Sequence, residues 1–329
     1  MKVLFIGGTG IISSACSKHA LANGIDLYHL NRGESKSIRP IEGVKTLIAD
    51  VRKPEEVAQV IQGHHFDAVV DWIAFVPEHI ENDIRLFRDK TDQYVFISTA
   101  ALYQTPPEKL PITEETKLEN PVWEYARNKI ACEEKLRAEF IQSGFPYTIV
   151  RPSHTYDKTL IPMQGGYTIL KRMMDGLPVV VHGDGASIWT LTHNQDFAKG
   201  LIGLLGKKQA INEAYHITSD EWQSWDTIFK TMARALGVEP DLVHIPSEKI
   251  ATYDRDIGDS LLGDKTHSMI FDNSKIKALV PDFKAEIPFE QGAQEIAAWY
   301  QANPLGLEID QRLNDLMEQM ISDSRFGSK

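Results

Sequence analysis

The chain has 329 residues, of which 42% are hydrophobic, and its formal net charge is −11. This length and composition are typical of a globular protein with one large domain or two intertwined ones. The acidic balance disfavours nucleic acid as a partner, because binding to a phosphate backbone depends on clustered Lys and Arg. The two cysteines, Cys16 and Cys132, lie far apart in apolar segments, and no apolar run is long enough for a signal segment or a membrane span. We therefore expect a cytoplasmic protein without membrane association.

The first apolar segment, residues 2–6, predicts a strand that runs directly into Gly-Gly-Thr-Gly at residues 7–10 and then into a helix. Glycines allow the backbone to turn tightly and to approach a pyrophosphate, while the N–H groups at the helix start point at the phosphates. An ordinary glycine-rich loop has the same appearance, so later residues must support a dinucleotide site. The cofactor residues expected here are Gly7, Thr9, Gly10, Ile11 and Ile12.

Apolar strands alternate with helix-length amphipathic segments through the first half of the chain. The strands are expected at 26–30, 46–49, 68–70, 94–97 and 147–150, and the helices between them at 54–62, 77–88 and 123–143. This alternation predicts an α/β fold with a doubly wound parallel Rossmann sheet.

After about residue 160 the alternation is lost, which predicts a smaller substrate-binding lobe in the C-terminal part. We expect the Rossmann domain at 1–160 and 190–218, the lobe at 161–189 and 219–304, and a helical tail at 305–329. In the tail, Ile309, Leu313, Leu316 and Met320 recur at helical spacing. This amphipathic helix is expected to dock on its own domain or on a partner subunit.

The second strand ends at Asn31 and Arg32, where dinucleotide folds choose between a ribose hydroxyl and a ribose phosphate. An acidic residue would repel a 2′-phosphate, whereas Arg32 could bind it, which slightly favours NADP over NAD. A solvent-facing Arg32, or one stacked on adenine, explains the sequence equally well. Asp50 and Val51, at the end of the third strand, are placed for the adenine edge, although a strand-end Asp is often a turn residue.

The next candidate site consists of three side chains that could assist hydride transfer: a hydroxyl, a phenol and an amine. Thr99 follows the fifth strand, and Tyr125 and Lys129 share one face of the next helix because they are four residues apart. An ammonium beside a phenol lowers the pKa of the tyrosine, so Tyr125 can act as an acid or base for a substrate hydroxyl. The Thr99 hydroxyl would bind the reacting oxygen, and Lys129 would also hold the nicotinamide ribose. The alternative is a surface Tyr–Lys pair.

These features resemble the short-chain dehydrogenase/reductase superfamily in its extended form, the NAD-dependent epimerase/dehydratase family. The resemblance covers residues 1–304 and rests on the motifs at 7–10, 98–103, 125–129, 151–156, 183–185, 193–196 and 272–275. It implies that Thr99, Tyr125 and Lys129 are catalytic and that Ala74, Pro152, Tyr125 and Lys129 lie against the cofactor. It also implies a homodimer through a four-helix bundle of the helices around 78–89 and 123–142.

Departures from the family pattern point to the substrate. Ala100 and Ala101 stand where sugar dehydratases of this family carry an acidic pair, which disfavours a sugar 4,6-dehydratase. Trp189 replaces an arginine, and His154 replaces an asparagine, that bind a substrate diphosphate in nucleotide-sugar enzymes. Aromatic and neutral hydrogen-bonding groups suit an uncharged sugar, a glycoside or an aromatic alcohol better. The expected substrate residues are Ala100, Tyr103, His154, Trp189 and His193, and Ser13, which stands where the third glycine is usual, is expected to weaken cofactor affinity.

We therefore expect an NAD(P)-dependent oxidoreductase or epimerase that acts on a hydroxyl or ketone of a carbohydrate-like small molecule. The sequence does not choose between an epimerase and a dehydrogenase. Two alternatives use the same scaffold without turnover: an RNA-binding relative, similar to the chloroplast stem-loop RNA-binding members of the superfamily, and a cofactor-binding redox sensor. No metal is expected, because His64 and His65 have no carboxylate or cysteine at ligand spacing.

Overall fold

The computed structural model describes residues 1–33, 41–303 and 308–326. Its centre is a seven-stranded parallel sheet in the order β11-β6-β5-β4-β1-β2-β3. The strands are β1 (Lys2–Ile6), β2 (Asp26–Asn31), β3 (Lys45–Ile48), β4 (Ala68–Asp71), β5 (Tyr94–Ile97), β6 (Tyr147–Pro152) and β11 (Glu213–Ile217). The strand order reverses between β1 and β4, and ligands of doubly wound sheets bind at such a reversal. The predicted Rossmann fold is confirmed.

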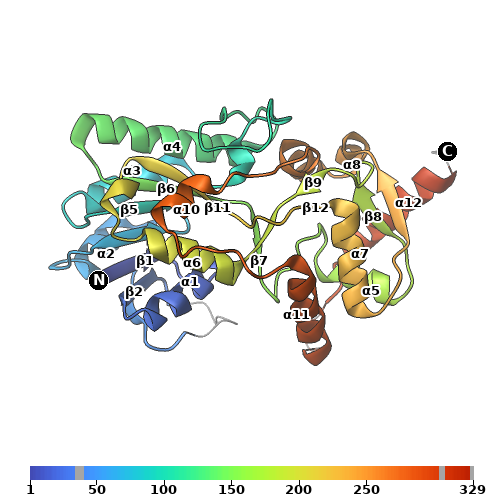
Figure 1. The fold of residues 1–329 in the computed structure, drawn as a ribbon, viewed down its shortest axis with the longest axis horizontal. Coiled ribbons are helices and arrows are strands. Elements are labelled where there is room, and N and C mark those ends of the chain that lie inside the picture. Colours follow the sequence, from blue (N-terminus) through green and yellow to red (C-terminus); the bar gives the residue numbers. More distant parts are fainter. Residues whose placement is uncertain (34–40, 304–307, 327–329) are drawn as a thin grey trace.

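Alternate residues of each buried strand face opposite layers of helices, which is why the strands read as continuous apolar runs. Val3 and Phe5 pack with α1 (Ile11–Ala22), α6 (Asn194–Leu204) and α10 (Ser274–Leu279). Leu4 and Ile6 face the other layer. That layer consists of α2 (Pro54–Val60), α3 (Pro77–Phe87) and α4 (Glu124–Ser143). Figure 1 shows this domain on the left, and the short turns η1 (Ala100–Leu102) and η2 (Lys208–Ala210) belong to it.

The remaining elements form a lobe with its own apolar core, on the right of Figure 1. Its strands pair as β8 (Val179–His182) with β13 (Leu242–Ile245) and β9 (Ile188–Trp189) with β12 (Gln223–Ser224). A third pair, β7 (His154–Tyr156) with β10 (Leu191–His193), connects the two parts. The helices are α5 (Tyr167–Met174), α7 (Trp225–Leu236), α8 (Ser247–Tyr253), α9 (Arg255–Ser260), α11 (Phe289–Ala302) and α12 (Gln311–Phe326), with a π-helical turn η3 (Leu261–Lys265). The exact domain boundaries given above remain predictions.

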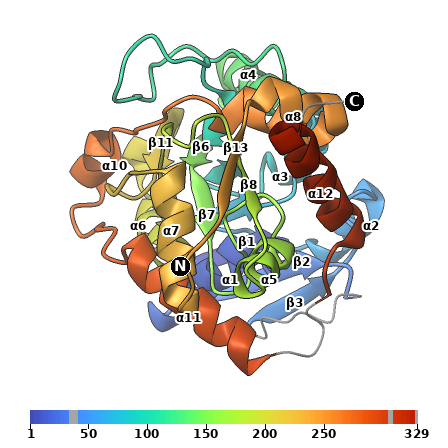
Figure 2. The same ribbon diagram turned by 90° about the vertical axis from the view of Figure 1, so that its right-hand side faces the viewer.

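The last helix packs on its own lobe rather than standing free. Leu313, Met317 and Met320 are buried in the lobe core, whereas Ile309 precedes the helix and is exposed. Figure 2 shows α12 beside α8, with which it is in contact. The Arg172 guanidinium adds a polar clamp by donating to the α12 residues Asn314 and Glu318, each at 2.6 Å. Over the ranges that the structure describes, no helix combines the length and apolarity needed to cross a bilayer.

Candidate functional site

The glycine loop between β1 and α1 has the geometry of a phosphate cradle. Gly7 and Gly8 adopt φ values of +100° and +112°, a region that residues with a Cβ rarely occupy. A Cβ on Gly8 would lie 2.5 Å from the ring of the buried His29. Ser13 does not disrupt the loop, because it is buried and its hydroxyl accepts a hydrogen bond from the Gly10 N–H at 2.9 Å. A Cβ at Gly8 would thus collide with the protein itself, and the bare backbone of this tight turn before α1 fits the close approach of a dinucleotide pyrophosphate.

A cavity of about 280 Å³ opens beside this loop, at the carboxyl ends of β1, β2 and β3. It is lined by Gly7, Thr9, Leu30, Asn31, Arg32, Ala49, Asp50, Val51, Arg52 and Ile73. Six of the predicted cofactor residues are thus brought together, while Gly10, Ile11 and Ile12 form the adjoining start of α1. The sequence analysis missed Arg52, whose guanidinium donates to the Ile73 carbonyl at 2.7 Å. Its position directly after Val51 was the available signal.

Tyr125 and Lys129 lie one turn apart on α4, as predicted from their spacing, but their electrostatics differ from the expectation. The buried Lys129 ammonium donates to the backbone carbonyls of Ala74 and Ile97 at 2.7 and 2.8 Å. Burial lowers the pKa of Lys129 to about 8. Burial also raises the pKa of Tyr125 to about 12, and the group that opposes this rise is the hydrogen-bonded Thr99 side chain. The expectation that Lys129 lowers the pKa of Tyr125 is therefore corrected for this structure, since the ammonium faces carbonyls rather than the phenol oxygen.

A second cavity, of about 290 Å³, lies between the Rossmann domain and the lobe. It is lined by Thr99, Ala100, Ala101, Trp123, Tyr125, Pro152, Ser153, His154, Trp189, Asp264 and Lys265. The structure thus places the predicted Thr99, Tyr125 and Pro152 beside the predicted substrate residues Ala100, His154 and Trp189. Burial lowers the pKa of His154 to about 3, so its imidazole is neutral and can both donate and accept hydrogen bonds.

Five residues of this cavity were not among the expected site residues: Ala101, Trp123, Ser153, Asp264 and Lys265. Ala101 and Ser153 adjoin expected residues in the chain. Trp123 directly precedes α4, and its proximity to Tyr125 in the chain could have indicated it. Asp264 and Lys265 lie in η3, more than a hundred residues after Lys129, and no local pattern marks them.

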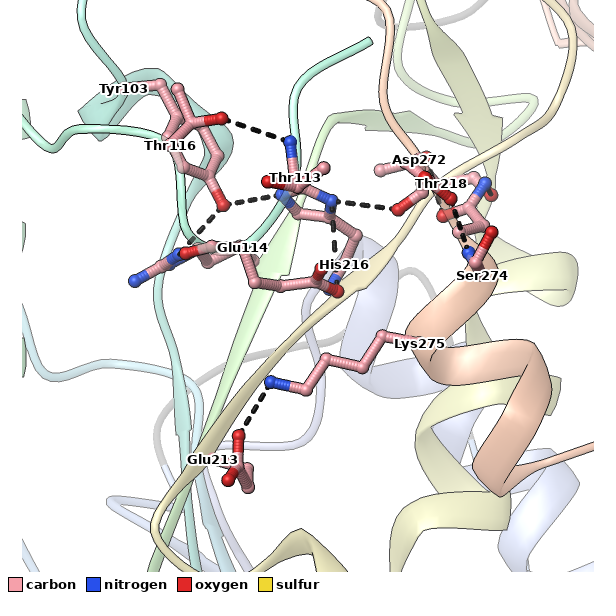
Figure 3. A network of polar contacts seen from close by, with 12 residues as sticks. Tyr103, Thr113, Glu114, Thr116, Glu213, His216, Thr218, Asp272, Ser274 and Lys275 are labelled. Carbon is pink, nitrogen blue, oxygen red and sulfur yellow. Dashed lines mark hydrogen bonds and ion pairs between the residues drawn. The ribbon is translucent and has the colours of Figure 1, made fainter.

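Two predicted substrate residues lie elsewhere. Tyr103 is fully buried: η1 turns the chain inward, and its hydroxyl accepts from Arg151 Nη1 at 2.7 Å and lies 2.5 Å from His216 Nε2 (Figure 3). His193 caps α6, and its Nε2 lies 3.1 Å from a Glu295 carboxylate oxygen. Neither residue lines the cavity among the described residues. Their assignment as substrate residues is corrected, because both side chains are engaged in packing the protein.

A buried ion pair fixes the helix that carries Tyr125 and Lys129. Glu133, two turns after Tyr125 on α4, pairs with Arg151 of β6 through an Nε–Oε1 distance of 2.9 Å and an Nη2–Oε2 distance of 2.5 Å. Both side chains are fully buried, and the Ser98 hydroxyl donates to the same carboxylate at 2.7 Å. Burial alone would raise the pKa of Glu133, but Arg151 and Ser98 hold it below its usual value. The pair therefore joins α4 to the ends of β5 and β6.

The network in Figure 3 extends this support to the edge strand β11. The Glu114 carboxylate accepts from the His216 backbone N–H at 2.9 Å, and the His216 ring lies 3.2 Å from the Asp272 carbonyl oxygen. Lys275 binds Glu213 at 2.6 Å on the outer side. These contacts are structural, and they hold the segments behind the cavity together. In the described ranges, no group of three or more His, Cys, Asp or Glu side chains is arranged to hold a metal ion.

Comparisons with known proteins agree with this geometry. The model of the NAD dependent epimerase/dehydratase family matches residues 3–218. The 2′-dehydrokanamycin reductase of Streptomyces kanamyceticus is 25% identical over 91% of this chain and 84% of that protein. The chloroplast stem-loop binding protein of 41 kDa b of Arabidopsis thaliana is 25% identical over 74% of this chain, and the match spans less than two thirds of that protein, 65%. The NAD complex of a Bacillus anthracis dTDP-glucose 4,6-dehydratase shares the fold, with a TM-score of 0.75 and 20% identity over 94% of this chain and all of that one.

Proposed function

This chain belongs to the NAD dependent epimerase/dehydratase family, a family of NAD-dependent enzymes, and from that premise we propose that it reduces a ketone, or oxidises the matching hydroxyl, of a sugar-like small molecule. The observation that carries the proposal is the cavity in which Thr99, Tyr125 and Pro152 meet, and a second cavity that the glycine loop lines supports it. An epimerase uses the same groups and returns the hydride to the other face.

When bound, the nicotinamide cofactor supplies or accepts a hydride at the substrate carbon. Tyr125 moves the proton at the substrate oxygen, and the Thr99 hydroxyl orients that oxygen by a hydrogen bond. Lys129 holds the backbone of Ala74 and Ile97 in place, and we propose that the remaining donor of its ammonium binds the ribose. A phenol with a pKa of about 12 is protonated at neutral pH, so Tyr125 can donate its proton to the oxygen of a ketone.

The cofactor we propose is NADP in preference to NAD. Asn31 and Arg32 follow each other at the end of β2, and Arg52 adds a second guanidinium to the same cavity. Two guanidinium groups without an acidic residue at the β2 end would stabilise a ribose 2′-phosphate.

Ala100 and Ala101 support a reaction without dehydration. Both residues line the substrate cavity directly after Thr99, and their methyl groups cannot exchange the protons that removal of water requires. We therefore place this protein outside the sugar 4,6-dehydratases.

A homodimer through α3 and α4, and a cytoplasmic location, also remain proposals. The two helices lie side by side and are joined by the ion pairs Lys135–Glu81 and Arg88–Glu139, so their orientation is fixed before any subunit contact. Size-exclusion chromatography with light scattering tests the dimer directly.

The similarity to a protein named for stem-loop binding keeps RNA binding as the second candidate. The net charge of −11 and the intact Tyr125–Lys129 pair count against it. A cofactor-binding redox sensor is the third, and it would need the same glycine cradle but not Tyr125.

The deciding experiment combines the nucleotide released on denaturation with a Tyr125→Phe variant. Mass spectrometry of the freshly purified protein identifies a bound cofactor, and titration with NAD and NADP measures affinity. We expect Tyr125→Phe to lower turnover about 100- to 10,000-fold on ketosugars while cofactor binding stays unchanged. Tyr300→Phe, in the lobe, is the matched control. A protein that binds neither cofactor, or that shifts a stem-loop RNA in a salt-sensitive way, would refute the proposal.

A further inference from the structure

The lobe side of the substrate cavity carries a buried ion pair of adjacent residues. Lys265 Nζ lies 2.9 Å from Asp264 Oδ2, and both side chains are only about one tenth exposed. They are the two charged side chains among the described residues that line the cavity, so the pair leaves the cavity with no net charge. Asp264 is also near enough to Tyr125 to contribute to the raised pKa of the phenol.

The turn that carries the pair is held firmly against the Rossmann domain. The Asn120 amide nitrogen donates to the carbonyl oxygens of Ala101 and Gly263, at 2.9 and 2.6 Å. A Cβ on Gly263 would lie 2.7 Å from the Trp123 Cβ, so glycine is needed for this close approach. The Lys265 carbonyl accepts from the Ser187 hydroxyl at 3.2 Å. Single-turn π-helices such as η3 frequently occur at functional sites, and here the turn presents two charges to the cavity in fixed positions.

Lys265 has hydrogen-bonding capacity that the described protein groups do not use. An ammonium has three donors, and within the described ranges the Lys265 ammonium has one acceptor, Asp264. Its Nζ lies 5.7 Å from the centre of the Trp123 ring and 6.0 Å from that of Trp189. The Trp189 indole N–H is also buried, with no partner among those groups. Buried donors of this kind are normally satisfied, so a ligand group is the natural acceptor.

We propose that Asp264 and Lys265 together bind two neighbouring hydroxyl groups of an uncharged sugar ring. The carboxylate accepts from one hydroxyl, the ammonium donates to the other, and Trp123 and Trp189 pack against the C–H faces of the ring. A nucleotide diphosphate fits less well, because Asp264 would repel it and the pair supplies only one cation. The inference rests on the proposed function, since it assigns the substrate class of that same cavity.

The test measures binding, independently of turnover. Saturation-transfer NMR in the presence of NADP is recorded with the methyl glycosides of glucose, galactose and mannose, and with UDP-glucose for comparison. We expect at least one methyl glycoside to bind more tightly than UDP-glucose. Lys265→Met and Asp264→Asn should each weaken that binding about tenfold, as expected for the loss of a charged hydrogen bond. Lys230→Met removes an exposed Lys–Asp pair of the same 2.9 Å length and should leave it unchanged.

Deoxy analogues separate recognition from a merely structural role. With the analogue that lacks the hydroxyl bound by Lys265, the wild type and Lys265→Met should bind equally well, whereas a structural defect weakens both ligands alike. Tighter binding of UDP-glucose than of every glycoside, no glycoside binding, or an unchanged affinity in Lys265→Met would overturn the proposal. Glycoside binding through Lys265 without any NAD(P)-linked reaction would instead refute the proposed function alone. Turnover of UDP-glucose that survives Lys265→Met would refute the recognition site alone.

Discussion

The two walls of the substrate cavity are built in different ways. The Rossmann wall presents Thr99, Tyr125 and Pro152 from the end of β5, from α4 and from the end of β6, all within the continuous sheet-and-helix scaffold. The lobe wall presents Trp189 and the Asp264–Lys265 pair from a two-residue strand and a π-helical turn. Groups that we assign to proton transfer thus lie on the long elements of the scaffold, and groups that we assign to recognition lie on short elements. The comparison teaches that charged substrate contacts, as we propose them, can be changed in the lobe without altering the groups on the sheet-and-helix scaffold.

The largest effect on stability is expected when the buried ion pair behind the Rossmann side of the cavity is broken. Glu133→Gln leaves Arg151 as an unpaired buried charge and should lower the free energy of unfolding by about 3–5 kcal/mol. Urea unfolding measures this change. Glu81→Gln removes an exposed ion pair of the same Rossmann domain and should cost at most about 1 kcal/mol. Equal effects of the two variants would show that Glu133 does not anchor α4.

Acid should lower the stability of the Rossmann domain and of the lobe by similar amounts, because each contains a buried histidine with a lowered pKa. Burial lowers the pKa of His29, in the Rossmann domain, and of His182, in the lobe, to about 4 each, against about 6.5 in the unfolded chain. Between about pH 4 and about pH 6.5 the unfolded chain binds more protons than the folded protein. The contribution of each neutral histidine to the free energy of unfolding is therefore complete above about pH 6.5 and is lost as the pH falls towards about 4. We expect a loss of about 2 kcal/mol per histidine between pH 7 and pH 5.

Urea unfolding at the two pH values tests this, with His29→Gln and His182→Gln each expected to reduce the pH dependence. The exposed His65→Gln variant is the control and should behave as the wild type does. A separate early transition that only His182→Gln alters would show that the lobe unfolds on its own.

Gly8→Ala should damage the cofactor cradle specifically. The new Cβ would have a strained φ of +112° and would meet the His29 ring at 2.5 Å. Gly24→Ala has milder backbone strain, because its φ of +71° borders the left-handed region, and its Cβ would meet no atom within 4 Å. We expect Gly8→Ala to cost about 1–2 kcal/mol more than this control and to weaken cofactor binding, as followed by unfolding and by NADP titration. Identical behaviour would argue against the close packing of Gly8 on His29.

The smallest expected effect is a change in cofactor affinity, which distinguishes NADP from NAD. Arg32→Gln should weaken NADP about tenfold and NAD hardly at all, because only NADP carries the 2′-phosphate. Isothermal titration with both cofactors measures the ratio, and Arg85→Gln, on α3, is the surface control. A parallel loss for both cofactors would assign Arg32 to the adenine instead.

Local patterns were sufficient for the sheet, the glycine loop and the Tyr125–Lys129 spacing, because each depends on residues close together in the chain. Contacts between residues that are far apart in the sequence could not be predicted from such patterns. The position of Asp264 at the cavity depends on the folded lobe, which no local pattern describes. Tyr103 was expected to contact the substrate, but η1 directs its side chain towards Arg151 and His216. The direction of the pKa shift of Tyr125 was predicted wrongly for the same reason. It depends on the burial of the phenol and on the backbone carbonyls that accept hydrogen bonds from Lys129.

The cofactor cavity and the substrate cavity have no lining residue in common among those described. In the roles that we propose, Arg32 and Lys265 contact different ligands from different cavities. Substitutions at the two positions should therefore be thermodynamically additive, with the double variant showing the sum of the single changes in binding free energy. For protein engineering this means that coenzyme choice and substrate scope can be adjusted one after the other, without reoptimising the first when the second is changed.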